Sequence, residues 1–100
     1  MESKPWRPVG EWHGVWGQLG VFELADAAQN VLFVGMVGGR SRFGLRGAIE
    51  AAAEEHSAAC YRCEITSAYL TRYREVLMRY ERSHGALPPH APALQLGRLG

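Results

Sequence analysis

The sequence predicts an α+β domain in which helices flank a small three-stranded antiparallel sheet. Two runs rich in β-branched and aromatic residues, 19–24 and 31–37, are separated by a short polar turn. Two longer segments, 44–56 and 67–83, carry apolar residues at helical spacing. A third β-rich run, 59–65, lies between them, so the expected order is strand, strand, helix, strand, helix.

The first two strands are expected to form a hairpin closed by the Asp-Ala-Ala-Gln-Asn segment at 26–30, which has turn chemistry. If the loop has an even residue count, Phe22 falls directly opposite Phe33, and Leu24 opposite Val31. The two phenylalanine rings would then share one face of the sheet. A β-bulge would break this pairing.

A glycine-rich basic loop at 38–42 precedes the first helix, which we expect over 44–56. The second helix is expected to begin after Ser67 as its N-cap and to end before Gly85. The predicted buried stripe of the first helix is Leu45, Ile49, Ala52 and His56. The predicted stripe of the second helix is Leu70, Tyr73, Leu77 and Tyr80.

The two ends of the chain are expected to lie outside the regular core at 19–85. Residues 1–18 hold three tryptophans among Pro and Gly without helical or strand periodicity. Such an irregular arm either packs its rings against the domain or docks a protein partner through them. Residues 86–100 contain three prolines and no periodicity, which predicts an extended tail.

Length and composition suit one globular domain, because the chain has 100 residues, of which 47% are apolar and 21% charged. No apolar run approaches the roughly 18 residues that a membrane span needs. The basic residues near the start are not followed by an apolar signal segment. We therefore expect no membrane partner and a cytoplasmic location.

The basic residues are unevenly distributed, although the net charge is only +1. Ten of the eleven are arginines, which suit bidentate contact with phosphate. A GC-rich genome is the alternative reason for so many arginines. The residues we expect to contact a nucleic acid, if one binds, are Arg40, Arg42, Arg72 and Arg79.

Cys60 and Cys63 form a single CxxC motif, and no second motif completes a four-ligand zinc site. On a strand, the two thiols point to opposite faces. We therefore expect two small, partly buried hydrophobic residues, with metal and redox roles as the alternatives.

Four features resemble the GIY-YIG nuclease domain. The triplets Gly20-Val21-Phe22 and Phe33-Val34-Gly35 match its two signature motifs, with the tyrosine of each replaced by phenylalanine. Arg46 begins the first helix, where the family places its catalytic arginine. Glu75 lies in the second helix, where the family places its metal-binding glutamate.

The resemblance covers about 20–91 and implies the same order of strands and helices. It includes a proline-rich closing turn at 84–91, in which Ala91 stands where the family commonly has asparagine. An intact member would hydrolyse a phosphodiester with one divalent metal, Mg²⁺ or Mn²⁺, held by the glutamate. The arginine would brace the phosphate oxygens, and a tyrosine would relay the proton from the attacking water.

Carried over to this chain, the resemblance makes Arg46 the phosphate clamp and Glu75 the metal ligand. Phe22 and Phe33 occupy the positions of the two phenols, but a phenyl ring neither accepts nor donates a proton. The alternative for the two charged residues is an ordinary surface ion pair, Arg46 with Glu50 and Glu75 with Arg79.

Three functions follow from these observations. The first, which we favour, is a catalytically impaired domain that binds a nucleic acid or a protein as an accessory module, because losing a general base costs about 10²–10⁴-fold in rate. The second is an active metal-dependent endonuclease, favoured by the retention of Arg46 and Glu75. The third is a small structural subunit that shares only the topology.

Overall fold

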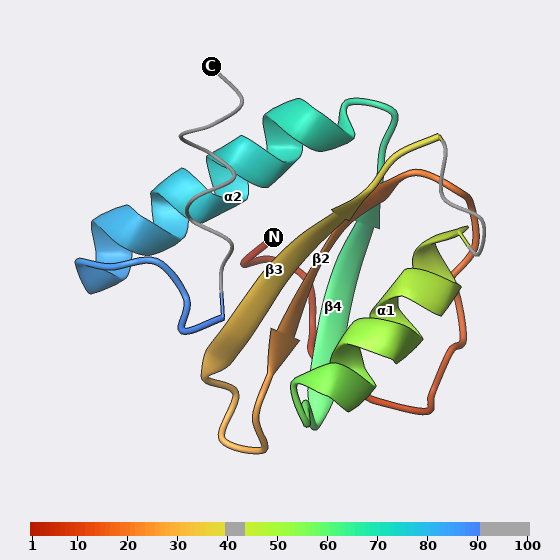
Figure 1. Ribbon diagram of the computed structural model, residues 1–100, viewed down its shortest axis with the longest axis horizontal. Helices are drawn as coiled ribbons and strands as arrows, with labels where there is room; N and C mark the ends of the chain where they lie inside the picture. The colour runs from red at the N-terminus through yellow and green to blue at the C-terminus, as the bar shows by residue number, and fades with distance from the viewer. Residues whose placement is uncertain (40–43, 91–100) are drawn as a thin grey trace.

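Two helices cover opposite faces of one antiparallel sheet, so the domain has three layers (Figure 1). The computed structural model describes residues 1–39 and 44–90. The elements in this part of the chain are β1 (Arg7–Pro8), β2 (Gly20–Ala25), β3 (Val31–Val37), α1 (Gly44–Glu55), β4 (Cys60–Ile65) and α2 (Tyr69–His84). The predicted α+β class is confirmed, and the five predicted elements lie close to their expected bounds.

The described part of the sheet has a fourth strand, so the prediction of three strands is corrected. The strand order is β1-β4-β2-β3, and all neighbours are antiparallel. Arg7 pairs with Tyr61 and Pro8 with Cys60. Proline has no N–H, and an edge strand such as β1 tolerates that loss. Two residues are too few to produce a periodic signal, and for this reason the arm reads as irregular in the sequence.

The turn between β2 and β3 is held by the side chain of Asp26. Its Oδ1 accepts hydrogen bonds from the backbone N–H groups of Ala28 and Asn30, both at 2.9 Å. Gln29 adopts a left-handed conformation with φ of 67°. The turn chemistry predicted for this segment is therefore present, with Asp26 as its organising residue.

The register of this hairpin differs from the expected one. Phe22 lies opposite Gly35, and Leu24 lies opposite Phe33. Ala25 pairs with Val31, so the register shifts by one residue between Leu24 and Ala25. The predicted direct pairing of Phe22 with Phe33 is wrong for two reasons: the loop between the paired Ala25 and Val31 has an odd number of residues, 26–30, and the ladder is irregular beside it. The two rings still meet diagonally, with centroids 6.0 Å apart.

Neighbouring atoms lie so close to Gly20 and Gly35, the glycines of the two triplets, that a larger residue would not fit at either position. A Cβ on Gly35 would lie 2.4 Å from Cζ of Phe22, whose buried ring lies over the glycine. A Cβ on Gly20 would lie 2.4 Å from the backbone oxygen of Glu64 on the neighbouring strand. The glycines of the two triplets therefore have a structural reason that does not depend on catalysis.

Alternation along β2 sends its side chains into two separate cores. The core on the α1 side consists of Phe22, Leu24, Val37, Leu45, Ile49, Ala53 and Tyr61. The core on the α2 side consists of Met1, Val21, Val34, Tyr73, Val76 and Leu77. Because the sheet lies between these cores, side chains that reach the sheet from α1 and from α2 do not meet.

The buried stripe of α1 is close to the prediction. Leu45 and Ile49 are buried as expected, and Ala53 is more deeply buried than Ala52. His56 lies just past the end of the helix and is partly buried, as the stripe predicted.

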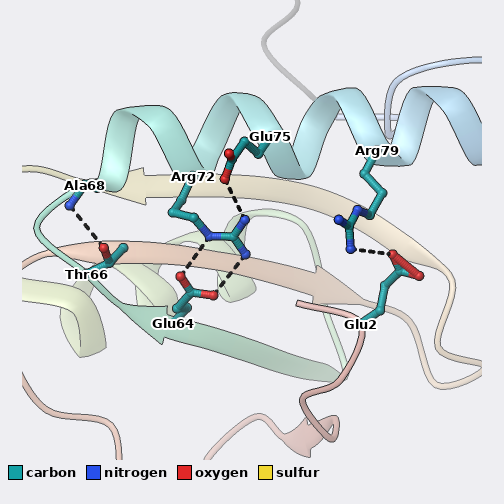
Figure 2. Close-up of polar contacts among 7 residues, drawn as sticks. All are labelled: Glu2, Glu64, Thr66, Ala68, Arg72, Glu75 and Arg79. Atoms are coloured by element: carbon teal, nitrogen blue, oxygen red, sulfur yellow. Dashed lines mark hydrogen bonds and ion pairs between the residues drawn. The ribbon is translucent and has the colours of Figure 1, made fainter.

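The stripe of α2 is shifted, because Val76 is buried and the predicted Leu70 is exposed. Either stripe fits the helical period, and only the direction of the sheet decides between them. The predicted N-cap is also wrong: the N-cap is Ala68, whose N–H donates to Oγ1 of Thr66 at 3.0 Å (Figure 2). Gly85 ends the helix in the left-handed conformation, as predicted.

The described beginning of the tail lies against the outer strand. Pro88 is buried, and the N–H of His90 donates to the carbonyl oxygen of Leu32 at 3.0 Å. Residues 91–100, and with them Ala91, lie outside the described residues. In the described part of the chain, neither helix combines the length and apolar character that crossing a membrane requires.

The first test concerns the close approach of β2 and β4. We expect Gly20→Ala to lower the free energy of unfolding by roughly 1–3 kcal/mol, because the new Cβ would force the two backbones apart. Urea unfolding followed by tryptophan fluorescence measures this. Gly39→Ala is the matched control, since its Cβ would make only an ordinary contact of 3.7 Å. Equal effects of the two substitutions would contradict the interpretation.

Candidate functional site

The two phenylalanines at the family's tyrosine positions are part of the packed interior on the α1 side. Phe22 is 3% exposed and belongs to the core. Phe33 is partly buried, and His56 stacks on it with ring centroids 4.6 Å apart. His90 stacks on His56 in turn, at 4.7 Å. Stacked aromatic and imidazole rings therefore surround the positions at which an intact family member would carry its phenols.

Arg46 lies on α1, on the same side of the sheet as these rings. Its side chain is exposed, and its Nε donates to Oε1 of Glu50 at 3.2 Å, which is the predicted surface pair. Its guanidinium also lies 5.7 Å from the centroid of the Trp12 ring. Trp12 packs in turn against Tyr61, which belongs to the core on the α1 side. Arg46 therefore lies at the edge of this core.

Glu75 lies across the sheet, on α2. Its Oε1 accepts a hydrogen bond from Nη1 of Arg72 at 2.8 Å, so its partner is Arg72 and not the predicted Arg79. The structure therefore brings Phe22 and Phe33 together but keeps Glu75 away from them and from Arg46. The residues from 1 to 39 and from 44 to 90 contain no group of three or more His, Cys, Asp or Glu side chains arranged to hold a metal ion.

The arginines expected to contact a nucleic acid fall into two sets. Arg40 and Arg42 lie outside the described residues. Arg72 and Arg79 both point from α2 toward the strands and the N-terminal segment (Figure 2). Each of these two is bonded to carboxylates of the same chain.

The structure instead forms a charged cavity of about 320 Å³ between α2, the sheet and the N-terminal segment. Its most buried charged residue is Glu23, in the central strand and only 4% exposed. Nε of Arg62, the direct cross-strand neighbour of Glu23 on β4, donates to Oε1 of Glu23 at 2.5 Å. The guanidinium of Arg62 also lies 4.2 Å from the centroid of the Trp6 ring, within range of a cation–π interaction.

Arg72 links the sheet to the helix wall of this cavity (Figure 2). Its Nε and Nη2 donate to the two carboxylate oxygens of Glu64 on β4, at 2.8 and 3.0 Å. Its Nη1 holds Glu75. The hydrogen bonds from Arg72 hold the pKa of Glu64 below its ordinary value, and those to Glu64 raise the pKa of Arg72.

At the mouth of the cavity the contacts are looser. Nη1 of Arg79 approaches Oε1 of Glu2 at 3.4 Å, and both side chains are 66% exposed. An exposed pair of this length contributes little to stability, so another partner could replace either group at little cost in free energy. Tyr80 and His84 stack beside them, with centroids 3.9 Å apart.

Glu23, Arg62 and Trp6 are not among the site residues expected from the sequence. The signal was a single carboxylate in the middle of an apolar strand, in a position that alternation assigns to a buried face. An arginine in the middle of the third β-rich run was its natural partner, because buried charges are paired. Neither residue belongs to a spaced motif, so a search for motifs passes over both.

The three tryptophans of the arm have different environments. Trp6 and Trp12 are partly buried against Arg62 and Tyr61, so the expected packing of the arm on the domain is seen for these two. Trp16 is 70% exposed. Of the three tryptophans, Trp16 is therefore the one to which the expected docking of a protein partner can apply.

Cys60 and Cys63 are thiols that are partly buried on opposite faces of β4. Sγ of Cys60 lies 3.4 Å from the carbonyl oxygen of Asp26, whereas Cys63 packs against the core on the α1 side. Burial raises the pKa of both thiols, which disfavours the reactive thiolate.

Comparisons of the chain with models of protein families, with curated proteins and with solved structures gave no match. The resemblance to the GIY-YIG domain therefore depends on the residues of the two triplets, Arg46 and Glu75.

The link between Glu64 and Arg72 predicts a dependence of stability on pH. The folded pKa of Glu64 is below its ordinary value of 4.5, so the pair stabilises the fold above about pH 4.5 and this contribution is lost as the pH falls through the folded pKa. We expect the difference in unfolding free energy between the native chain and Glu64→Gln to be largest near neutral pH and to shrink in acid.

Urea unfolding at a series of pH values measures this difference. Glu50→Gln is the matched control, because the Arg46–Glu50 pair is exposed and should contribute little at any pH. A difference for Glu64→Gln that stays constant from neutral to acid pH would rule out the assigned role.

Proposed function

We propose that this chain is a catalytically impaired GIY-YIG-like domain that acts as a binding module for a protein partner. One observation carries the proposal: Arg46 and Glu75 extend from helices on opposite faces of the sheet. The two phenyl rings lie on the α1 side only, and they cannot relay a proton. As part of the proposal the domain works in the cytoplasm.

Cleavage of a phosphodiester requires the clamp and the metal on one phosphate. Both an arginine and a metal ligand must then lie within about one hydrogen-bond length, roughly 3 Å, of groups bound to the same phosphorus atom. A sheet with a packed core on each side separates Arg46 from Glu75. Each of the two already has an ion-pair partner on its own helix, which favours a structural role for both.

A protein is a better partner than a nucleic acid for the described surface. Arg46, Arg62, Arg72 and Arg79 each form an ion pair with a glutamate. With a net charge of +1, little positive field is left to attract phosphates from a distance.

The exposed tryptophan supports protein docking. Trp16 is large, apolar and 70% exposed, and tryptophan is enriched among the residues that dominate protein interfaces. The adjacent Gly17 packs against Ile65 at the end of β4, and Ile65 is itself partly exposed. A second exposed apolar residue, at the end of β4, therefore lies against the residue that follows Trp16 in the chain.

Restoring the missing phenols tests the loss of catalysis. We expect no cleavage of supercoiled plasmid, branched DNA or single-stranded DNA by the native chain in Mg²⁺ or Mn²⁺ beyond that in EDTA. We expect the same of the double variant Phe22→Tyr/Phe33→Tyr, because the phenols alone do not bring Glu75 to the site. Metal-dependent nicking that disappears in Arg46→Ala and Glu75→Gln would establish the active nuclease instead.

Binding across a range of salt concentrations separates the two classes of partner. We expect no saturable binding of single-stranded or branched DNA or of RNA at physiological ionic strength, and we expect proteins captured from the source cells by the native chain to be lost with Trp16→Ser. Val9→Ser, a smaller exposed apolar residue, is the control. Tight nucleic-acid binding that weakens steeply with salt would make nucleic acid the partner.

A further inference from the structure

The cavity beneath α2 has more charged groups than packing requires. Glu23 and Arg62 are both largely buried there, and Glu23 lies on a strand whose neighbouring inward residue, Val21, belongs to the apolar core. Replacing a buried ion pair with apolar residues is often neutral or stabilising, so a need for stability alone does not explain this one. A polar cavity kept at such a cost is typical of a binding site.

The groups available to a ligand follow from the hydrogen bonds already formed. All three guanidinium nitrogens of Arg72 are engaged, with Glu64 and Glu75. Oε1 of Glu75 accepts from Arg72, and among the described residues its Oε2 has no hydrogen bond. Arg79 makes one long contact with Glu2. The helix wall therefore offers one carboxylate oxygen, held in place by Arg72, and one guanidinium that is easily released.

These two groups are one helical turn apart. Glu75 and Arg79 line the same cavity, and residues at this spacing have Cβ atoms about 5–6 Å apart. A glutamate four residues before an arginine is well placed for a direct ion pair, but here each is bonded to a different partner. A ligand that carries an ammonium and a carboxylate on one carbon atom would fit between them.

The overall charge of the cavity selects the same class of ligand. Three arginines, three glutamates and the N-terminal residue Met1 are among its lining residues, so charges of both signs face the cavity. A phosphate or a nucleotide would meet carboxylates that repel it, whereas a zwitterion gains from both signs. The apolar part of the wall, formed by Trp6, Val31, Val76 and Tyr80, accommodates an apolar side chain.

We propose that this cavity binds a free α-amino acid with an apolar or aromatic side chain, with the ammonium on Glu75 and the carboxylate on Arg79. The carboxylate would form a bidentate contact with the guanidinium fork and displace Glu2. The volume of about 320 Å³ lies in the range of small-ligand sites. The site is independent of the docking surface at Trp16, so it stands whether or not the proposed function holds.

A titration of the full chain followed by two-dimensional NMR tests this. The probes are L-phenylalanine and L-leucine, with phenethylamine and 3-phenylpropionate as analogues that lack one charge each. We expect saturable shifts at the Trp6 indole and at Asn30, and affinities lower by about tenfold or more for both analogues. No saturable shift with either amino acid at concentrations on the order of 10 mM, or equal affinity for an analogue, would overturn the proposal.

Variants at the two helix positions complete the test. Arg79→Gln and Glu75→Gln should each weaken L-phenylalanine binding by about tenfold or more, since each removes one charge contact. Both side chains are exposed, so the variants should fold, and their spectra report this directly. Arg74→Gln and Glu81→Gln change exposed residues of α2 that are not among those lining the cavity and should bind as the native chain does. Equal binding by all four variants would refute the assigned contacts.

Discussion

The central strand β2 is buried along its whole length and on both faces, and the rest of the structure depends on that burial. Each of its side chains must be accepted by one of two cores, because successive residues point to opposite faces. Phe22 and Leu24 therefore require α1 on one side, and Val21 requires α2 on the other. Glu23 is the exception, since a carboxylate in this strand is tolerated only with a partner. Its direct cross-strand neighbour Arg62 supplies that partner, and the charged cavity follows from this single pair.

The fold could be predicted from the sequence wherever a local period carries the information. Alternating and helical patterns placed the strand at 31–37 and the helix starting at Gly44 without error. The predictions that were wrong concern properties that hydrophobic periodicity does not encode. The hairpin register depends on hydrogen bonds to Asp26 and on the space that Gly35 leaves for a ring. Whether α2 buries Leu70 or Val76 depends on where the sheet lies, and a strand of two residues has no pattern to detect.

The candidate site was harder to predict than the fold, because spacing along a chain does not say which face of a sheet a helix will cover. Arg46 and Glu75 stand at the positions that the family resemblance selects, but the path of the chain carries one to each face. The residues that the structure does bring together, Glu23 with Arg62 and Glu64 with Arg72, are separated by 39 and 8 positions in the chain. In the sequence these residues could be recognised only as charged side chains on buried or half-buried strands, where a charge needs a partner of opposite sign.

The pairing of charges determines how this domain can recognise a partner. An arginine that already shares its charge with a glutamate exerts little force at long range, but it retains direction at contact distance. Arg72 illustrates this, because its fork fixes Glu64 on the sheet and orients Glu75 on the helix. Ordering a glutamate side chain costs up to about 2 kcal/mol of conformational entropy, and here that cost falls on folding instead of on binding. Under the proposals made above, such fixed groups favour ligands and surfaces that match them at short range over a polyanion attracted from a distance.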